Sequence, residues 1–273
     1  MKNDQIMKYP RTAHLEGSGF QKGDEDSDIV PFIDLQGKFL VIEEKVDGGN
    51  CGVSFNDDCE LMLQCRGHYL LGNGDWPQFD QFKVWGNTWK DYLFDVLDTR
   101  YIMYGEWLSD LHSVYYDLLP HFFMEFDIYD KQTDTFLSTE KRNEMIERFP
   151  MDVESVRVLE AKVFEDPREM LGLIGRSAFI SDSAYEDLEN IALGKGLPRA
   201  DIDILLALNK SKMMEGLYVK WEENGIVKGR YKYVRPDFVQ TILSYGKHWL
   251  DRPSLPNKMK DGCDMFSIRR ERL

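Results

Sequence analysis

A lysine that ends an apolar run has the clearest potential for chemistry in this sequence. Lys45 lies at the end of a run that begins at residue 39, and Asp47-Gly48 follows directly. The run predicts a strand, and Asp-Gly predicts a tight turn, so the amine would be presented where the strand ends. A lysine amine is a nucleophile only when it is unprotonated, and its ordinary pKa is about 10.4. Neighbouring positive charges would lower that pKa, so the chemistry depends on other cations near Lys45.

Positive charges gather in residues 216–234, which have the pattern of two strands. Asn224-Gly225 between them is a strong signal for a β-hairpin turn. Because side chains alternate along a strand, three basic residues of the second strand share one face, namely Lys228, Arg230 and Lys232. That face is either the exposed charged side of an ordinary hairpin or a set of cations that face a bound triphosphate.

The other elements follow from hydrophobic periodicity. We expect strands at residues 38–45, 50–55, 59–65, 101–107 and 122–130. A helix is predicted at residues 87–98, capped by Asn87. Residues 139–212 change character, and helices near 167–174, 183–193 and 198–212 predict a helical insertion on one side of a sheet-based core. A short helix is expected at residues 240–245.

Composition limits the class of protein. With 273 residues, 42% of them hydrophobic, the chain can form one sizeable core or a core with a small module. No apolar run approaches the roughly 20 residues that span a bilayer, and the first residues do not resemble a signal peptide, so a cytoplasmic protein is predicted. The net charge of −14 argues against a protein that coats nucleic acid. The clustered cations instead suggest short contacts with nucleic acid in one basic cleft.

Five short segments resemble, in order, the successive motifs of the covalent nucleotidyltransferases. This superfamily contains the ATP-dependent RNA and DNA ligases and the mRNA-capping guanylyltransferases. The segments are Glu44-Lys45-Val46-Asp47-Gly48-Gly49-Asn50, Tyr104-Gly105-Glu106-Trp107-Leu108, Phe126-Asp127-Ile128-Tyr129, Glu215-Gly216-Leu217-Tyr218-Val219-Lys220 and Arg230-Tyr231-Lys232-Tyr233. The second and third are similar to the RNA ligase branch that includes phage type-2 and RNA-editing ligases. The resemblance spans residues 38–235.

The resemblance implies a role for each matching residue. Lys45 would be the nucleophile that becomes adenylylated. Its nucleotide site would include Glu44, Asp47, Gly48, Asn50, Arg66, Glu106, Phe126, Lys220, Arg230 and Lys232. Within this set, Glu44 and Phe126 resemble the adenine contacts, Glu106 the ribose contact and Lys220 the α-phosphate lysine.

Further roles concern catalysis. Glu215 and Glu106 resemble metal-binding acids, and Glu215, Lys220 and Lys232 join Lys45 as the implied catalytic residues. Lys220 and Lys232 would also supply the field that lowers the pKa of Lys45. Asp47 could hold its turn by an Asx-type bond. The last motif departs from the usual Lys-x-Lys, because Arg230 stands at the first position, and an arginine is not equivalent to a lysine.

These observations together predict an α+β nucleotidyltransferase domain with antiparallel-rich sheets over residues 1–238, and a short extension over residues 239–273. The predicted activity is that of an ATP-dependent RNA ligase which joins RNA 5′-phosphate and 3′-hydroxyl ends in RNA repair. The expected cofactors are ATP and Mg²⁺, with Mn²⁺ as a substitute, and the expected partners are RNA and an end-healing kinase or phosphatase. Action on DNA ends or with GTP, and a non-catalytic RNA-binding module, remain alternatives.

Overall fold

A computed structural model describes residues 6–20, 28–72, 76–245 and 253–269. Its strands are β1 (Ala13–Leu15), β2 (Ile29–Val30), β3 (Phe39–Lys45), β4 (Gly49–Phe55), β5 (Leu61–Cys65), β6 (Tyr101–Trp107), β7 (Phe123–Asp130), β8 (Thr135–Leu137), β9 (Glu154–Ser155), β10 (Val158–Val163), β11 (Gly216–Glu223) and β12 (Ile226–Val234). The helices are α1 (Asp80–Thr88), α2 (Lys90–Leu97), α3 (Thr139–Ile146), α4 (Ala184–Gly194), α5 (Arg199–Asn209) and α6 (Pro236–Tyr245). Three 3₁₀ helices are η1 (Phe32–Leu35), η2 (Pro77–Phe79) and η3 (Pro167–Leu173).

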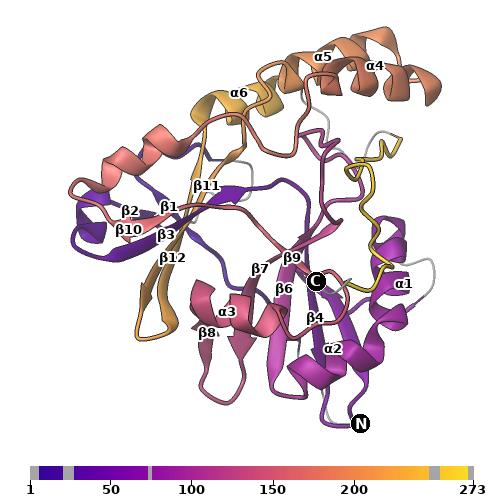
Figure 1. The fold of residues 1–273 in the computed structure, drawn as a ribbon. Helices are drawn as coiled ribbons and strands as arrows, with labels where there is room; N and C mark the ends of the chain where they lie inside the picture. The colour runs from indigo at the N-terminus through magenta and orange to yellow at the C-terminus, as the bar shows by residue number, and fades with distance from the viewer. Residues whose placement is uncertain (1–5, 21–27, 73–75, 246–252, 270–273) are drawn as a thin grey trace.

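The strands form one continuous hydrogen-bonded path in the order β10-β3-β11-β12-β8-β7-β6-β4-β5. Every neighbouring pair along this path is antiparallel, whereas β1 joins β12 in parallel and β9 joins β7 in parallel. The path bends into two groups, β10-β3-β11-β12 and β8-β7-β6-β4-β5, that meet near the middle of the molecule (Figure 1). The expected antiparallel-rich sheet with helices is confirmed.

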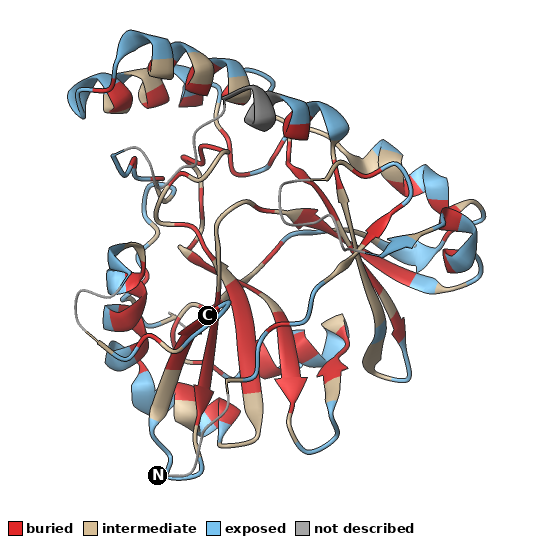
Figure 2. Cartoon of the chain, turned by 180° about the vertical axis from the view of Figure 1, so that it is seen from behind, coloured by how far each residue is buried: buried red, intermediate tan, exposed pale blue. Residues whose placement is uncertain are grey.

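Helices cover the two groups of strands on different sides. Helices α1 and α2 pack against β4, β5 and β6, whereas α4, α5 and α6 lie together across the top of the molecule (Figure 1). Buried residues run along the strands of the second group, while the helices expose their outer sides (Figure 2). Helices therefore pack on both groups of strands, and this packing holds the strands that carry the site residues in position.

The Asn224-Gly225 signal was correct, whereas Asp47-Gly48 does not close a hairpin, because β3 and β4 do not pair with each other. Asn224 and Gly225 have φ of 54° and 75°, the left-handed pair that a tight hairpin turn requires. Gly48 lies where no larger residue fits, because an added Cβ would come 2.5 Å from the carbonyl oxygen of Trp107. The turn after Lys45 therefore approaches β6 closely, and this brings Glu106 near the lysine.

The single helix predicted at residues 87–98 is wrong. Trp89 interrupts it with φ −101° and ψ 11°, so that two shorter helices, α1 and α2, replace it. Asn87 is not a cap but lies inside α1, where its amide donates to the carbonyl oxygen of Lys83 at 2.8 Å. Tyr92, which the periodicity assigns to the apolar face, is 41% exposed.

Residues 139–212 also differ from a purely helical insertion. Helices α3, α4 and α5 and the 3₁₀ helix η3 are present, but β9 and β10 lie in the same range. Strand β10 pairs with β3, with Val163 opposite Phe39, and it forms one edge of the strand path. Its residues are mostly exposed, although Leu159, Ala161 and Val163 alternate with Glu160 and Lys162 in the pattern of a strand.

Among the described residues, no helix combines the length and the apolar character that crossing a membrane requires.

Candidate active site

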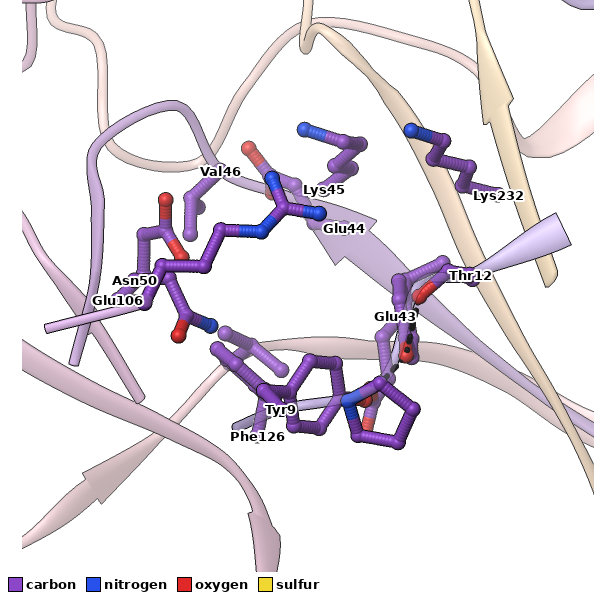
Figure 3. Close-up of a pocket in the computed structure, with 14 residues that line it drawn as sticks. Tyr9, Thr12, Glu43, Glu44, Lys45, Val46, Asn50, Glu106, Phe126 and Lys232 are labelled. Atoms are coloured by element: carbon purple, nitrogen blue, oxygen red, sulfur yellow. Dashed lines mark hydrogen bonds between the residues drawn. The ribbon is translucent and has the colours of Figure 1, made fainter. Parts of the chain in front are cut away.

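A pocket opens where the two groups of strands meet. It is lined by Tyr9, Pro10, Thr12, Glu43, Glu44, Lys45, Val46, Asn50, Arg66, Glu106, Phe126, Val156, Tyr218 and Lys232. Lys45 and Lys232 extend toward one end of it, and Tyr9 and Phe126 lie at the other (Figure 3). The pocket therefore has a cationic end and an aromatic end, which suits a ligand that carries phosphate at one end and a flat ring at the other.

Lys45 contacts a carboxylate that the next strand supplies. It is the last residue of β3, and the antiparallel register places it opposite Gly216, the first residue of β11. Glu215, one residue earlier, is 1% exposed and accepts a hydrogen bond from Lys45 Nζ at 2.5 Å. The register of β3 and β11 thus pairs the amine with an acid from a segment 170 positions away.

Carboxylates dominate the charge around Lys45. Burial on its own would lower the pKa of the Lys45 ammonium, but Glu215, Glu106 and Asp47 raise it, and the net shift is upward. The expectation that neighbouring cations lower this pKa is therefore wrong for the pocket without ligand. The free pocket stabilises the charged form of Lys45, so its proton must leave before the amine can act as a nucleophile.

Two of the acids near Lys45 hold protons more strongly than an ordinary glutamate does. Burial raises the pKa of Glu106 to about 8, although the Lys45 charge and a hydrogen bond from the backbone N–H of Gly48 oppose this. Burial raises the pKa of Glu215 to about 7, opposed by Lys45 and Lys232. We call Lys45, Asp47, Glu106, Glu215 and Lys232 the lysine group. Its carboxylates outnumber its cations, so the group can still take up positive charge.

Asp47 has a structural contact of longer range than the expected Asx turn. Its Oδ2 accepts from the backbone N–H groups of Ser113 and Val114, at 2.6 and 3.1 Å. The backbone N–H of Asp47 donates to the hydroxyl of Tyr116 at 3.0 Å. Asp47 therefore ties the turn after Lys45 to the loop that follows β6.

Beneath the aromatic end lies a second ionic group, with all five side chains fully buried. It consists of Glu43, Glu125, Asp127, Arg142 and Lys220, and we call it the sealed ion cluster. Arg142 on α3 reaches Glu43 at 2.7 Å and Glu125 at 3.2 Å. Since Glu43 lies on β3 and Glu125 on β7, this arginine links the two groups of strands.

The family model for RNA ligase matches residues 38–234, most of the chain. This chain belongs to the RNA ligase family. No curated protein matches it significantly.

Solved structures of Naegleria gruberi RNA ligase are similar in fold. The structure with PPi gives a TM-score of 0.50 at 18% identity and covers 88% of this chain and 65% of that one. A mutant without ligand gives 0.50 at 15% identity, covering 87% and 60%. A mutant with AMP and Mn gives 0.48 at 17% identity, covering 77% and 53%. The present chain thus spans between about half and two thirds of those chains.

The structure collects many of the predicted site residues in one pocket. Those that line it are Glu44, Lys45, Asn50, Arg66, Glu106, Phe126 and Lys232. The carboxyl of Glu44 is buried, which raises its pKa, while the neighbouring Ser177, the backbone of Ala178 and the charge of Arg157 act in the opposite direction. Asn50 on β4 lies opposite Glu106 on β6.

Lys220 does not lie where an α-phosphate lysine would need to be. Its side chain is fully buried, and its ammonium contacts Glu43 at 2.9 Å and Asp127 at 3.2 Å and donates to the carbonyl oxygen of Phe126. The ammonium is thus engaged in the sealed ion cluster, and Lys220 does not line the pocket. Lys232 is the strand cation that reaches the pocket, alongside Lys45.

Arg230 is also directed elsewhere. Its guanidinium stacks 3.7 Å from the ring centroid of Phe136 and 5.3 Å from that of Tyr9. It lines a neighbouring groove together with Lys228. The three basic residues predicted on one face of β12 therefore divide between two cavities, and only Lys232 belongs to the pocket of Lys45.

Seven of the lining residues were not predicted, and four of these carry a polar side-chain group: Tyr9, Thr12, Glu43 and Tyr218. Tyr218 has a local signal, because it lies between Glu215 and Lys220 in a recognised motif and alternation can direct it inward. Tyr9 has none, since its position depends on how residues 6–12 cross the sheet. Among the residues that the structure describes, no group of three or more His, Cys, Asp or Glu forms a ready-made metal site.

Proposed function

We propose that this chain is an ATP-dependent RNA ligase that acts through a lysyl-AMP intermediate. The observation that carries the proposal is the contact between Lys45 Nζ and Glu215 Oε2 in a pocket that also contains Lys232 and an aromatic end. An amine with an adjacent proton acceptor and a second cation is what attack on a phosphorus atom requires. Family membership agrees with this chemistry.

In the first step Lys45 Nζ attacks the α-phosphorus of ATP. A nitrogen–phosphorus bond forms, the bond to the pyrophosphate oxygen breaks, and pyrophosphate leaves. The proton of Lys45 passes to Glu215, whose pKa of about 7 suits a proton acceptor near neutral pH. Lys232 extends toward the same end of the pocket and would stabilise the phosphate charge (Figure 3). In the ligand-free pocket the carboxylates hold the amine charged, so bound nucleotide must shift this balance.

Two later steps would transfer the AMP and seal the RNA. An oxygen of an RNA 5′-phosphate attacks the lysyl-AMP phosphorus and releases Lys45, and a 3′-hydroxyl then displaces AMP to form the phosphodiester bond. Arg66 lines the pocket from the exposed turn after β5 and is positioned to meet an incoming 5′-phosphate. Asn50, opposite Glu106, would support these later steps.

The acids near Lys45 fit a divalent cation such as Mg²⁺ or Mn²⁺. Glu106 and Glu215 are hard oxygen ligands whose pKa values are raised by burial, with Lys45 acting against this. A bound cation would neutralise charge on the transferred phosphoryl group. The chain's own contribution is to hold these carboxylates beside Lys45 through the β3–β11 and β4–β6 registers.

We assign the chain to the phage type-2 and RNA-editing branch on the two motifs around Glu106 and Phe126, with RNA repair in the cytoplasm as its role and an end-healing enzyme as a partner. The nucleotidyltransferase domain would span residues 1–238 and the extension residues 239–273. In that extension, the Asn257 side chain bonds the backbone of Tyr116 and Leu108, at 3.0 and 2.9 Å. The extension is thereby docked on the domain.

The deciding experiment is incubation with ATP labelled at the α-phosphate, together with Mg²⁺. Wild type should form an acid-labile covalent adduct, and Lys45→Ala should form none while keeping its thermal unfolding midpoint. Lys90→Ala, which changes an exposed lysine on α2, is the matched control and should label like wild type. Equal labelling of Lys45→Ala would overturn the mechanism. Assays with the other three nucleotides, and with nicked RNA and DNA, separate the related alternatives.

A further inference from the structure

Residues 7–15 are built into the pocket and cross from one group of strands to the other. The carbonyl oxygen of Met7 accepts hydrogen bonds from Gln64 Nε2 at 2.9 Å and from the Tyr104 hydroxyl at 2.7 Å. Farther along, β1 pairs in parallel with β12, with His14 opposite Lys232. Tyr9, between these two anchors, is therefore held in place from both sides.

Tyr9 lies among aromatic rings at the end of the pocket away from Lys45 (Figure 3). Its ring centroid is 5.1 Å from that of Phe126 and 5.1 Å from that of Tyr104, both in edge-to-face arrangement. Its hydroxyl contacts Asp127 and the hydroxyl of Tyr218. Tyr9 and Tyr218 both line the pocket, so a base that enters this end would lie beside their rings and phenol groups.

Asp127 determines which hydroxyl donates in each of these hydrogen bonds. Asp127 faces the Lys220 ammonium at 3.2 Å, and its carboxylate can only accept, so the Tyr9 hydroxyl donates to it. With its proton committed, Tyr9 oxygen accepts from the Tyr218 hydroxyl. Burial and the Asp127 charge both raise the pKa of Tyr9, which keeps the phenol protonated.

Tyr218 therefore has its proton directed inward. Thr12 Oγ1 lies 3.3 Å from the Tyr218 hydroxyl and can supply it with a second proton donor. What the two phenols have left to offer the pocket is lone pairs on oxygen. A ligand atom that contacts them must bring its own hydrogen.

We propose that Tyr9 and Tyr218 form a relay, polarised by Asp127, which selects a nucleotide base carrying an exocyclic amino group at this end of the pocket. The inference rests on the proposed use of a nucleotide and names residues that set its base preference. An amino group donates to the phenol oxygens, whereas a carbonyl oxygen at the same position would face lone pairs and find no proton. The relay thus favours adenine over hypoxanthine or guanine.

The test compares ATP with purine riboside triphosphate, which lacks the amino group, and with ITP, which carries an oxygen in its place. Wild type should form the lysyl adduct from ATP with a kcat/KM roughly three- to tenfold higher than from purine riboside triphosphate, as expected for one hydrogen bond. Tyr218→Phe should lower the ATP value to that of purine riboside triphosphate and leave the latter unchanged. Tyr92→Phe removes an exposed phenol on α2 and should match wild type.

Tyr9→Phe gives the sharper result. Without the Tyr9 oxygen, the Tyr218 hydroxyl loses its acceptor and its proton can turn to the pocket. The kcat/KM for adduct formation from ITP, divided by that from ATP, should then rise at least threefold over wild type. A simple packing defect would not change this preference. If kcat/KM fell by the same factor for all three nucleotides, in Tyr9→Phe or in Tyr218→Phe, the relay would be overturned.

Direct binding of the same three triphosphates separates this inference from the proposed function. If wild type formed no adduct but bound ATP in preference to ITP, and Tyr218→Phe removed that preference, the relay would stand and the ligase mechanism would fail. If wild type formed the adduct and neither variant changed base preference, the mechanism would stand and the relay would fail.

Discussion

The sealed ion cluster and the lysine group both draw on β3, and each combines three acids with two cations, yet they differ in exposure. Strand β3 carries Glu43 and Lys45 two residues apart, and β11 leads from Glu215 at its start to Lys220. In the sealed ion cluster each cation contacts two carboxylates at 2.7–3.2 Å, without exposure. In the lysine group Lys45 keeps 24% of its side chain exposed and borders the pocket.

This difference separates structure from chemistry. Buried ions whose partners are all protein groups stabilise one arrangement and leave nothing for a ligand. A partly open group remains able to bind a cation or a phosphate that brings one. The sequence motifs alone do not show which of the two groups can bind a ligand, because both groups contain motif residues.

The largest expected effect is on stability and concerns Lys220. Lys220→Met would leave Glu43 and Asp127 buried without their shared cation, which should cost about 3–5 kcal/mol in the free energy of unfolding. Lys45→Met should change that free energy by less than about 1 kcal/mol, because Glu215 can bind a proton instead. Urea unfolding measures both, and equal losses in the two variants would erase the contrast between the two regions.

A smaller effect concerns pH and the lysine group. Glu106 and Glu215 titrate near pH 8 and 7 when folded, against 4.5 for an ordinary glutamate. Between these values the folded chain holds protons that the unfolded chain has released, so stability falls as pH rises through this window. We expect a loss of roughly 1–2 kcal/mol from pH 5 to 8, after allowance for screening.

The matched control for this pH dependence is the double variant Glu106→Gln and Glu215→Gln. It should lose less stability over the same window, measured by thermal unfolding at each pH. In wild type the rate of lysyl adduct formation should move in the opposite direction and rise as Glu215 ionises around pH 7. A rate that stays level across pH 6–8 would remove Glu215 as the proton acceptor.

The smallest effect concerns Arg230, which stacks on rings outside the pocket. Arg230→Leu should cost about 0.5–1 kcal/mol of stability through loss of the cation–π contact with Phe136. Adduct formation from ATP should stay within about twofold of wild type. If Arg230→Leu lost as much adduct formation as Lys232→Leu in the same labelling assay, Arg230 would be placed at the phosphate after all.

Local signals predicted the parts of the fold that local chemistry decides. The Asn224-Gly225 turn, the strand ending at Lys45 and the paired strands β6 and β7 could be read from the sequence, because alternation and turn residues determine them. Strand β10 could not, since it is an exposed edge strand that β3 holds in place by backbone hydrogen bonds. The break at Trp89 was hidden for a similar reason, as its neighbours continue the helical period.

Within the site, sequence reasoning named Lys45 and Glu215, which the structure brings into contact, but it did not predict their electrostatics. Lys220 and Lys232 look equivalent in the sequence, and only the strand registers show that one is sealed among carboxylates while the other enters the pocket. Tyr9 lay outside every motif. A residue that reaches a site through the path of a loop leaves no periodic trace, so sequence reasoning passed over it.

The parallel pairing of β1 with β12 affects how the molecule assembles. Ala13 and Tyr231 are partners although roughly two hundred residues of chain separate them. Contacts this distant are entropically slow to close, so the segment that carries Tyr9 must wait for nearly the entire sheet to be synthesised. Strand β12, which bears Lys232, should therefore pair with β1 late in folding. The nascent chain would acquire nucleotide affinity only at the end of folding.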